Sequence, residues 1–396
     1  MYVGLACFAS LVFLYSLVSE KVEHLSLSGP IVFVATGALL GPLGLNWFSL
    51  TADSVNGKAL IDITLALFLF VDAASADLGV LRQNWRIPGR MLLFGLPLSI
   101  GLGAAAALWL FPSLSLYQAA ILGTMLAATD AALGKAVVTN QAVPHHLREG
   151  LSAESGLNDG LCVPFLLLFI ALEQGSAVRG EGLAMELLLE ELGIGLLVGA
   201  VIAAVAARAL VMARAAGWLG HVWQRMSVPA LALVVFAIAQ SLHGSGYIAA
   251  FVGGLCFRAA MREDLHALVV PAEGVGEVMA MLAWLLFGLM LVPAALPFIT
   301  WNEVLYATLS LTVIRILPIM LSLSGTGEKL QSKVFLAWFG PRGLASLAFA
   351  TMVWAEGIPS AGTLVSVTIL TVVISLVAHG LSARPFARRF DNPGVP

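Results

Sequence analysis

Residues 150–172 read GLSAESGLNDGLCVPFLLLFIAL. This stretch is long enough to cross the hydrocarbon core of a bilayer, which takes about 20 mostly apolar residues. It nevertheless carries Glu154 and Asp159 in its first half. Ionisable side chains at membrane depth are costly, and they normally face the interior of a helix bundle or a water-filled cavity. The stretch therefore predicts a membrane-spanning helix whose polar face lies inside a larger bundle.

The composition of the whole chain also indicates a membrane protein. Of its 396 residues, 60% are apolar and 11% are charged, and the formal net charge is −3. Soluble domains carry about 45–50% apolar and about 25% charged residues. We therefore expect membrane lipids as surroundings and no nucleic-acid partner. The three cysteines lie in apolar runs without metal-ligand spacing, so we expect no cofactor.

Apolar stretches follow one another along the chain. They predict an all-α polytopic membrane protein with about 13 transmembrane helices. Residues 1–384 would form one transmembrane unit, and residues 385–396 a short cytoplasmic tail. The predicted spans are 2–19, 30–46, 59–75, 90–111, 116–139, 150–172, 187–213, 228–242, 246–261, 275–292, 302–323, 331–355 and 361–383.

The basic residues predict an orientation in the membrane. The loops after even-numbered spans contain only Lys58 and Arg179. Cytoplasmic loops carry an excess of Lys and Arg, so we expect an N-terminus outside and a C-terminus in the cytoplasm, in a cytoplasmic (inner) membrane. Most of the 20 basic residues lie after odd-numbered spans or in the tail: Lys21, Arg82, Arg86, Arg90, Arg148, Arg208, Arg214, Arg225, Arg258, Arg262, Lys329, Lys333, Arg384, Arg388 and Arg389.

Polar residues of the sixth span gather on one side of the helix. Ser155 and Asp159 are four residues apart and so share a face, and Glu154 and Asn158 form a second such pair beside it. If the fifth and sixth spans pack side by side, Asp130 can approach this face. The sequence therefore predicts a cluster of oxygen-bearing groups at membrane depth.

Two spans contain residues that favour a break in the helix. Thr129 and Asp130 compete with the helix for backbone hydrogen bonds, and Pro341, between Gly340 and Gly343, lacks an N–H group. In transporters built from inverted repeats, paired broken helices expose carbonyl groups at the substrate site. We therefore predict an inverted repeat with two broken helices near the acidic face.

A buried aspartate is suited to hold either a cation or a proton. A small alkali cation binds oxygen ligands, and burial disfavours the ionised form of a carboxylate. An Asp159 that can hold one ion at a time would exchange the two if the site faced each side of the membrane in turn. The sequence thus predicts a secondary transporter, and no enzyme, that exchanges Na⁺, Li⁺ or K⁺ for H⁺.

Two arginines lie inside predicted spans and need acceptors, because a guanidinium stays charged. We expect Arg315 to pair with Glu154, which would leave Asp159 free, and Arg342 to belong to the same ion-pair region. The alternative is that Asp159 itself is permanently paired with one of the two arginines.

The motifs of the chain resemble those of the bacterial and archaeal electroneutral sodium/proton antiporters, which are relatives of the animal sodium/proton exchangers. The resemblance covers nearly the whole chain. It rests on residues 154–160, on Thr129-Asp130, on residues 243–254 and on residues 339–345. Ala131 stands where this family usually has Pro, and Asp72 where it more often has Glu.

The resemblance implies a thirteen-helix fold with an inverted repeat. It implies a mobile core of helices at about 90–172 and 275–355, with the remaining helices forming a scaffold and a homodimer interface. It also implies Na⁺ ligation by Asp159, Ser155, Asp130 and the carbonyl of Thr129. In that family, an Asn at position 158 accompanies one-for-one exchange.

Three other functions are compatible with parts of the sequence. A sodium- or proton-coupled symporter of a small organic anion would need donors for that anion, whereas the predicted site offers mostly acids and small residues. An intramembrane hydrolase could use Ser245 beside His243, although the G-x-S-x-G frame is missing. A channel would pass current and would need no titrating carboxylate.

Overall fold

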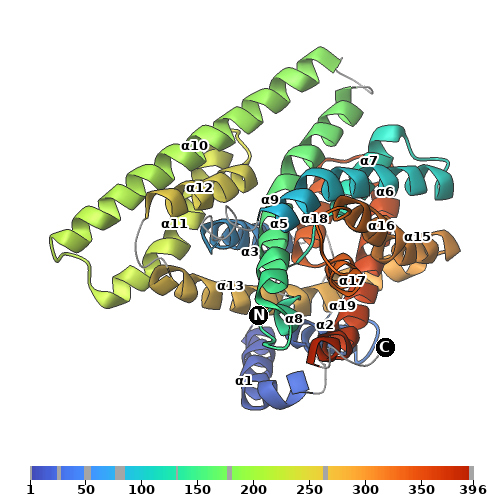
Figure 1. The fold of residues 1–396 in the computed structure, drawn as a ribbon, viewed down its shortest axis with the longest axis horizontal. Helices are drawn as coiled ribbons and strands as arrows, with labels where there is room; N and C mark the ends of the chain where they lie inside the picture. Colours follow the sequence, from blue (N-terminus) through green and yellow to red (C-terminus); the bar gives the residue numbers. More distant parts are fainter. Residues whose placement is uncertain are drawn as a thin grey trace.

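The computed structural model describes residues 2–24, 28–48, 55–75, 85–130, 133–175, 181–261 and 266–391, and every regular element in these ranges is a helix. Figure 1 shows their arrangement. The elements are α1 (Tyr2–His24), α2 (Gly29–Leu40), α3 (Val55–Ser75), α5 (Arg86–Arg90), η1 (Met91–Gly95), α6 (Leu96–Leu110), α7 (Leu116–Met125), α8 (Lys135–Val138), α9 (His145–Gln174), α10 (Glu181–Ala215), α11 (His221–Ser241), α12 (Gly246–Ala260), α13 (His266–Leu286), η3 (Phe287–Leu291), α14 (Val292–Ala295), η4 (Leu296–Phe298), α15 (Trp301–Leu311), α16 (Val313–Ser322), α17 (Leu330–Trp338), α18 (Leu344–Ala355) and α19 (Ala361–Asp391).

The predicted all-α membrane class is confirmed. Among the described residues, 8 helices are long and apolar enough to cross a bilayer, and three shorter apolar helices accompany them. Each of the predicted spans overlaps at least one helix. The basic residues Arg82, Arg179 and Arg262, which the orientation argument uses, lie outside the described residues.

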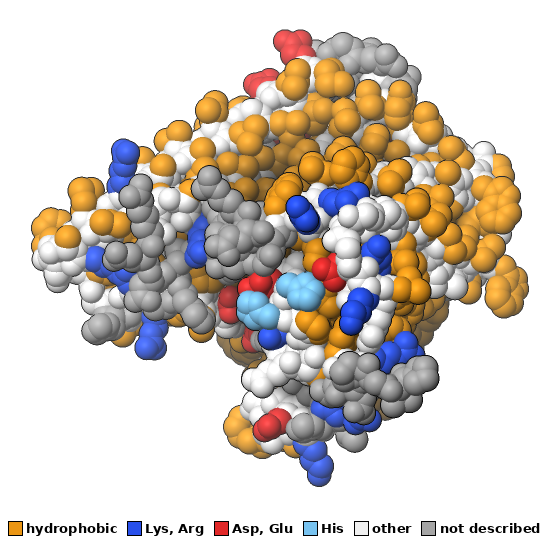
Figure 2. All heavy atoms as spheres, in the orientation of Figure 1, with side chains coloured by type: hydrophobic (Ala, Val, Ile, Leu, Met, Phe, Trp, Pro, Cys, Tyr) orange, Lys and Arg blue, Asp and Glu red, His pale blue; other side chains and the backbone are white. Residues whose placement is uncertain are grey.

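The surface supports the same class. Large hydrophobic side chains are exposed along many helices, including Trp109 at 70%, Trp223 at 73% and Trp301 at 84% exposure. Figure 2 shows that hydrophobic side chains cover much of the visible face. In water such a surface would be unfavourable, whereas lipid chains cover it at no cost.

Two predicted spans are divided in the structure. The predicted span 116–139 consists of α7 and α8, and the predicted span 331–355 consists of α17 and α18. Residues 126–130, here named the first break, and residues 339–343, here named the second break, are not helical. These are the two breaks expected at Thr129–Asp130 and at Pro341; Ala131 lies outside the described residues.

The last helix is longer than predicted. α19 continues through Pro385 to Asp391, so most of the range 385–396 that the sequence assigns to a tail is helical. The extension is stabilised by aromatic contacts with α17. The Phe386 ring stacks on Trp338 with centroids 6.1 Å apart, and Phe390 meets Phe335 edge-on at 5.2 Å.

The helices fall on two sides of a central region. α12 packs between α10 and α3, and α13 packs on α2, α3 and α11, whereas α6 packs on α7, α15 and α16. In Figure 1, α9 and α18 lie between α12 of the first group and α6 and α16 of the second. Both breaks are buried, since Thr129 and Arg342 are 0% exposed.

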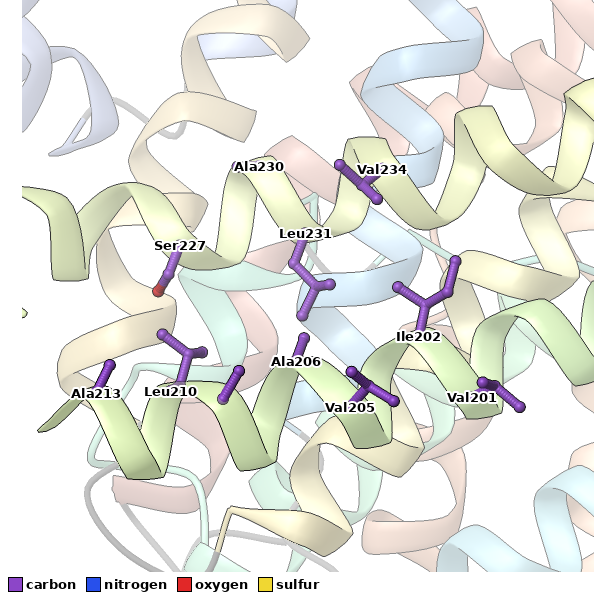
Figure 3. Close-up of a pocket in the computed structure, with 11 residues that line it drawn as sticks. Val201, Ile202, Val205, Ala206, Leu210, Ala213, Ser227, Ala230, Leu231 and Val234 are labelled. Carbon is purple, nitrogen blue, oxygen red and sulfur yellow. The ribbon is translucent and has the colours of Figure 1, made fainter. Parts of the chain in front are cut away.

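A groove between α10 and α11 lies away from this centre (Figure 3). Apart from Ser227, its lining consists of Val, Ile, Leu and Ala side chains. Such a lining suits a lipid acyl chain and provides no ligand for a cation.

Candidate functional site

The two breaks contact each other through backbone and carboxylate groups. The backbone N–H of Asp130 donates to the carbonyl of Pro341 at 2.8 Å. The backbone N–H of Leu344 donates to Oδ2 of Asp130 at 2.9 Å, and that of Leu133 donates to Oδ1 at 3.2 Å. Asp130 therefore lies where the two unwound segments cross.

Charged side chains stand at the two helix ends that the breaks create. The Asp130 carboxylate lies at the first residue of α18, where the helix dipole is positive. Arg342 lies at the C-terminal end of α7, where the dipole is negative, and donates from Nη1 to the carbonyls of Ala127 and Ala128, each at 3.1 Å. The two breaks thus stabilise each other with opposite charges.

Glu154 and Arg315 are among the electrostatic neighbours of Arg342, so it lies in the region expected for it. Its described hydrogen-bond partners, however, are backbone carbonyls. The reason is that a helix end leaves carbonyl groups without N–H partners, and the break supplies such groups within reach of the guanidinium.

Side chains of α9 hold the first break from the other side. The Ser155 and Thr129 hydroxyls are 3.1 Å apart. Asn158 directs Nδ2 toward the Ala127 carbonyl and the Thr129 hydroxyl, at 3.1 Å in both cases. The Cys162 thiol donates to Oδ1 of Asn158 at 3.3 Å, which is consistent with this amide orientation.

Arg315 and Glu154 form a buried ion pair. Nη1 and Nη2 of Arg315 donate to Oε1 and Oε2 of Glu154 at 2.8 and 3.1 Å. Nδ2 of Asn158 also lies 3.3 Å from Oε1 of Glu154. Burial without such a partner would be costly for either charge.

Asp159 differs from the other buried charges. It is 9% exposed, and among the described residues no group donates a hydrogen bond to its Oδ1. Its electrostatic neighbours include the carboxylates of Asp130, Asp72 and Glu154, and the backbone of Thr129 donates a hydrogen bond to the carboxylate. The described hydrogen bonds of Arg315 and Arg342 go elsewhere, so neither is the permanent partner considered as an alternative.

The structure thus brings the sequence-predicted residues together around α9 and the first break. Thr129, Asp130, Ser155 and Asp159 provide hydroxyl, carbonyl and carboxylate oxygens, whereas Asn158 uses its amide to hold the break. Asp72 on α3 lies against the same place, because a β-carbon on Gly156 would be 3.4 Å from the Asp72 β-carbon.

The rival hydrolase motif has a structural role. Ser245 begins α12 as its N-cap, and its hydroxyl accepts a hydrogen bond from the Ile248 backbone at 3.4 Å. Gly244 packs against Ile194, where a β-carbon would clash. Both observations explain these residues by helix capping and close packing.

Sequence reasoning missed three polar residues that serve the breaks. The Ser346 hydroxyl donates to the Met125 carbonyl at 2.8 Å, at the end of α7. Ser375 and His379 of α19 contact the second break. A histidine inside the apolar span 361–383 was the available signal for the last of these.

The chain is similar to known proteins over most of its length. The family described as sodium/hydrogen exchanger, transmembrane, matches residues 8–389. The K(+)/H(+) antiporter NhaP2 of Shewanella oneidensis is 24% identical over 388 residues, covering 94% of this chain and 64% of the relative. The K(+)/H(+) antiporter NhaP of Alkalimonas amylolytica is 25% identical, covering 95% and 65%. The chain therefore spans just under two thirds of the length of these relatives.

A solved structure shows the same fold. The sodium proton antiporter MjNhaP1 from Methanocaldococcus jannaschii at pH 8 is similar, with a TM-score of 0.79 and 19% identity, and the match covers 96% of this chain and 99% of that one. At this identity the similarity establishes the architecture.

Proposed function

Because this chain belongs to the sodium/hydrogen exchanger family, we propose that it exchanges a monovalent cation, Na⁺, Li⁺ or K⁺, for protons across a membrane. Asp159 holds the two ions in turn. The observation that carries the proposal is the buried Oδ1 of Asp159, which has no described hydrogen-bond donor. A buried carboxylate oxygen without a partner is costly, and either a proton or a cation removes that cost.

The cation ligands would come from the first break and from α9. We assign them to the carboxylates of Asp159 and Asp130, the Ser155 hydroxyl and the Thr129 carbonyl. The 3.1 Å contact between Ser155 and Thr129 supports this set, because it places oxygens of both segments side by side.

The stoichiometry would be one proton for one cation. Glu154 is neutralised by Arg315, and Asn158 is uncharged, so Asp159 is the exchangeable carboxylate on this face of α9. One proton then replaces one monovalent cation, and each cycle moves no net charge.

The arrangement of the bundle suggests how the site reaches both sides. The helices at about 90–172 and 275–355, which include α9 and the two broken helices, would move as a core. The remaining helices would form the scaffold against which this core moves. We further propose a homodimer formed through that scaffold, in a cytoplasmic membrane, with the N-terminus outside and the C-terminus in the cytoplasm.

The symporter alternative has less support. An organic anion needs a pocket with hydrogen-bond donors or positive charge. The groups described around Asp159 are other carboxylates and hydroxyls, and the nearby guanidinium groups donate to Glu154 and to carbonyls.

The test is proton movement in proteoliposomes that contain the purified chain and a pH-sensitive dye. Addition of Na⁺, Li⁺ or K⁺ in turn should dequench the dye without any organic solute. Proton movement that requires an organic anion would instead favour the symporter, and a current without proton movement would favour a channel.

A further inference from the structure

We propose that His379 and Ser375 of α19 are positioning residues for the exchange, because they clamp the second break and through it fix Asp130 and the first break. This inference rests on the proposed function for its effect on transport. We name these two side chains and their hydrogen bonds to Trp338 and Arg342 the clamp. The clamp is observed in the structure and does not depend on the proposed function.

The clamp is a continuous chain of hydrogen bonds. Nε2 of His379 lies 2.9 Å from the carbonyl of Trp338. Nδ1 of His379 lies 3.1 Å from the Ser375 hydroxyl, and that hydroxyl accepts from the backbone N–H of Arg342 at 2.7 Å. The chain therefore joins the last residue of α17 to a residue just before α18.

Both ring nitrogens of His379 lie near carbonyl groups, because Nδ1 is also 3.0 Å from the Ser375 carbonyl of its own helix. We assign the neutral tautomer that carries its hydrogen on Nε2, because this tautomer donates to Trp338 and so links α19 to α17. Nδ1 is then an acceptor, and the Ser375 hydroxyl donates to it while accepting from Arg342. The ring is also packed between aromatic side chains, with centroids 5.2 Å from Trp338 and 6.3 Å from Phe339.

The clamped segment reaches the first break directly. Pro341 accepts from the Asp130 backbone, the Leu344 backbone donates to the Asp130 carboxylate, and Arg342 donates to the carbonyls of Ala127 and Ala128. A shift of residues 339–343 would therefore displace Asp130 and the neighbouring backbone oxygens.

α9 and α19 play matching parts in the two breaks. On α9, Asn158 and Ser155 bond to the break that follows α7. On α19, Ser375 bonds to Arg342 inside the break that follows α17, and His379 bonds to Trp338, the residue just before that break. The difference is that α9 also presents the carboxylate of Asp159, whose Oδ1 has no described hydrogen-bond donor, whereas the α19 side chains are uncharged and hydrogen-bonded to each other. We infer that the first break, together with α9, binds the ions and that the second break holds the first in position.

The experiment uses the full chain with substitutions at the clamp. His379→Ala and Ser375→Ala remove its two side chains, while His379→Gln and Ser375→Thr retain a donor and an acceptor. Thr371→Val is the matched control, because this buried hydroxyl one turn earlier on α19 donates to the Val367 carbonyl of its own helix at 2.7 Å.

Two measurements are made on each variant. The first is the KM for the driving cation in proteoliposomes. The second is hydrogen–deuterium exchange of peptides that cover residues 339–344, with peptides of α10 and α12 as an internal reference. A role limited to general stability would accelerate exchange in all of these helices and leave the KM of the folded fraction unchanged.

We expect both alanine variants to raise the cation KM about tenfold, the scale of one buried hydrogen bond, and to accelerate exchange in residues 339–344 alone. The Gln and Thr variants should stay near wild type. Wild-type KM and exchange in both alanine variants, or an equal change in Thr371→Val, would overturn the proposal. If His379→Ala does not fold, the KM and the exchange of Ser375→Ala alone support or overturn the proposal.

The exchange measurement separates this inference from the proposed function. If the wild-type chain moves no protons with any cation, the proposed function fails. Faster exchange of residues 339–344 in Ser375→Ala would still support the clamp, and unchanged exchange would reject it.

Discussion

Arg315 and Glu154 form a two-bond ion pair inside the bundle, with N–O distances of 2.8 and 3.1 Å. Both residues are almost fully buried, at 2% and 1% exposure. Arg315 neutralises the charge of Glu154. Glu154 therefore differs from Asp159, which lies five residues later on the same helix.

Loss of one partner of this pair should destabilise the protein. In Arg315→Ala, Glu154 stays buried without a counter-charge, and we expect a loss of about 3–5 kcal/mol in stability. Thermal melting and yield in detergent measure the effect. The double variant Arg315→Gln with Glu154→Gln should recover part of the loss, since no charge remains unpaired; an active, stable Arg315→Ala protein would show that the pair is not needed.

Asp159→Asn should abolish cation-dependent proton movement without unfolding the protein. The amide cannot exchange a proton for a cation, and removal of a buried carboxylate should leave the melting temperature unchanged or raised. Asp62→Asn is the matched control. This carboxylate on α3 accepts from the Tyr247 hydroxyl at 2.7 Å, a bond that an amide oxygen can keep. Retained exchange in Asp159→Asn would remove Asp159 from its proposed role.

Protons and cations should compete for one group. A ligand that must be deprotonated binds cations less well as the pH falls, so the cation KM should rise with acidity. The rise should approach about tenfold per pH unit once the carboxyl is mostly protonated. Initial rates over a grid of pH and cation concentration measure this relation, and a KM independent of pH would mean that the two ions use separate sites.

One-for-one exchange should be insensitive to membrane potential. Each cycle replaces one positive charge by another, so a diffusion potential set with a membrane-permeant anion, without a K⁺ gradient, should not change the initial rate of Na⁺-driven exchange. Acceleration by a potential of one sign and slowing by the other would indicate unequal stoichiometry.

The sequence reveals the elements of the site because charge inside an apolar run is visible without coordinates. The polar face of residues 154–159 and the helix-breaking residues 340–343 follow directly from residue types. The Arg315 pairing follows as well, since a guanidinium that stays charged needs an acceptor.

Other features depend on the three-dimensional arrangement. The partners of Arg342 are carbonyls that only the geometry of the break leaves free. His379 is visible in the sequence as a polar residue inside a span. Its partner Trp338 lies 41 residues away and contributes a backbone oxygen, and a backbone contact cannot be predicted from the residue type. The extension of α19 to Asp391 likewise depends on ring contacts with α17.

Gly343 should be intolerant of any side chain, because the two breaks cross at this residue. A β-carbon there would overlap the Asp130 carboxylate, and the carboxylate cannot move away without losing its bonds to Leu344 and Leu133. In Gly343→Ala we therefore expect a loss of cation-driven proton movement of at least about tenfold, since overpacking costs about 1–3 kcal/mol.

Gly101→Ala provides the control for Gly343→Ala, because a β-carbon on this glycine of α6 would meet nothing within 4 Å. Its transport should equal that of the wild type, and its helix should be slightly more stable. Full activity in Gly343→Ala would mean that Asp130 can leave the end of α18 during transport. The contact between the two breaks would then be one state of the cycle and not a fixed support for it.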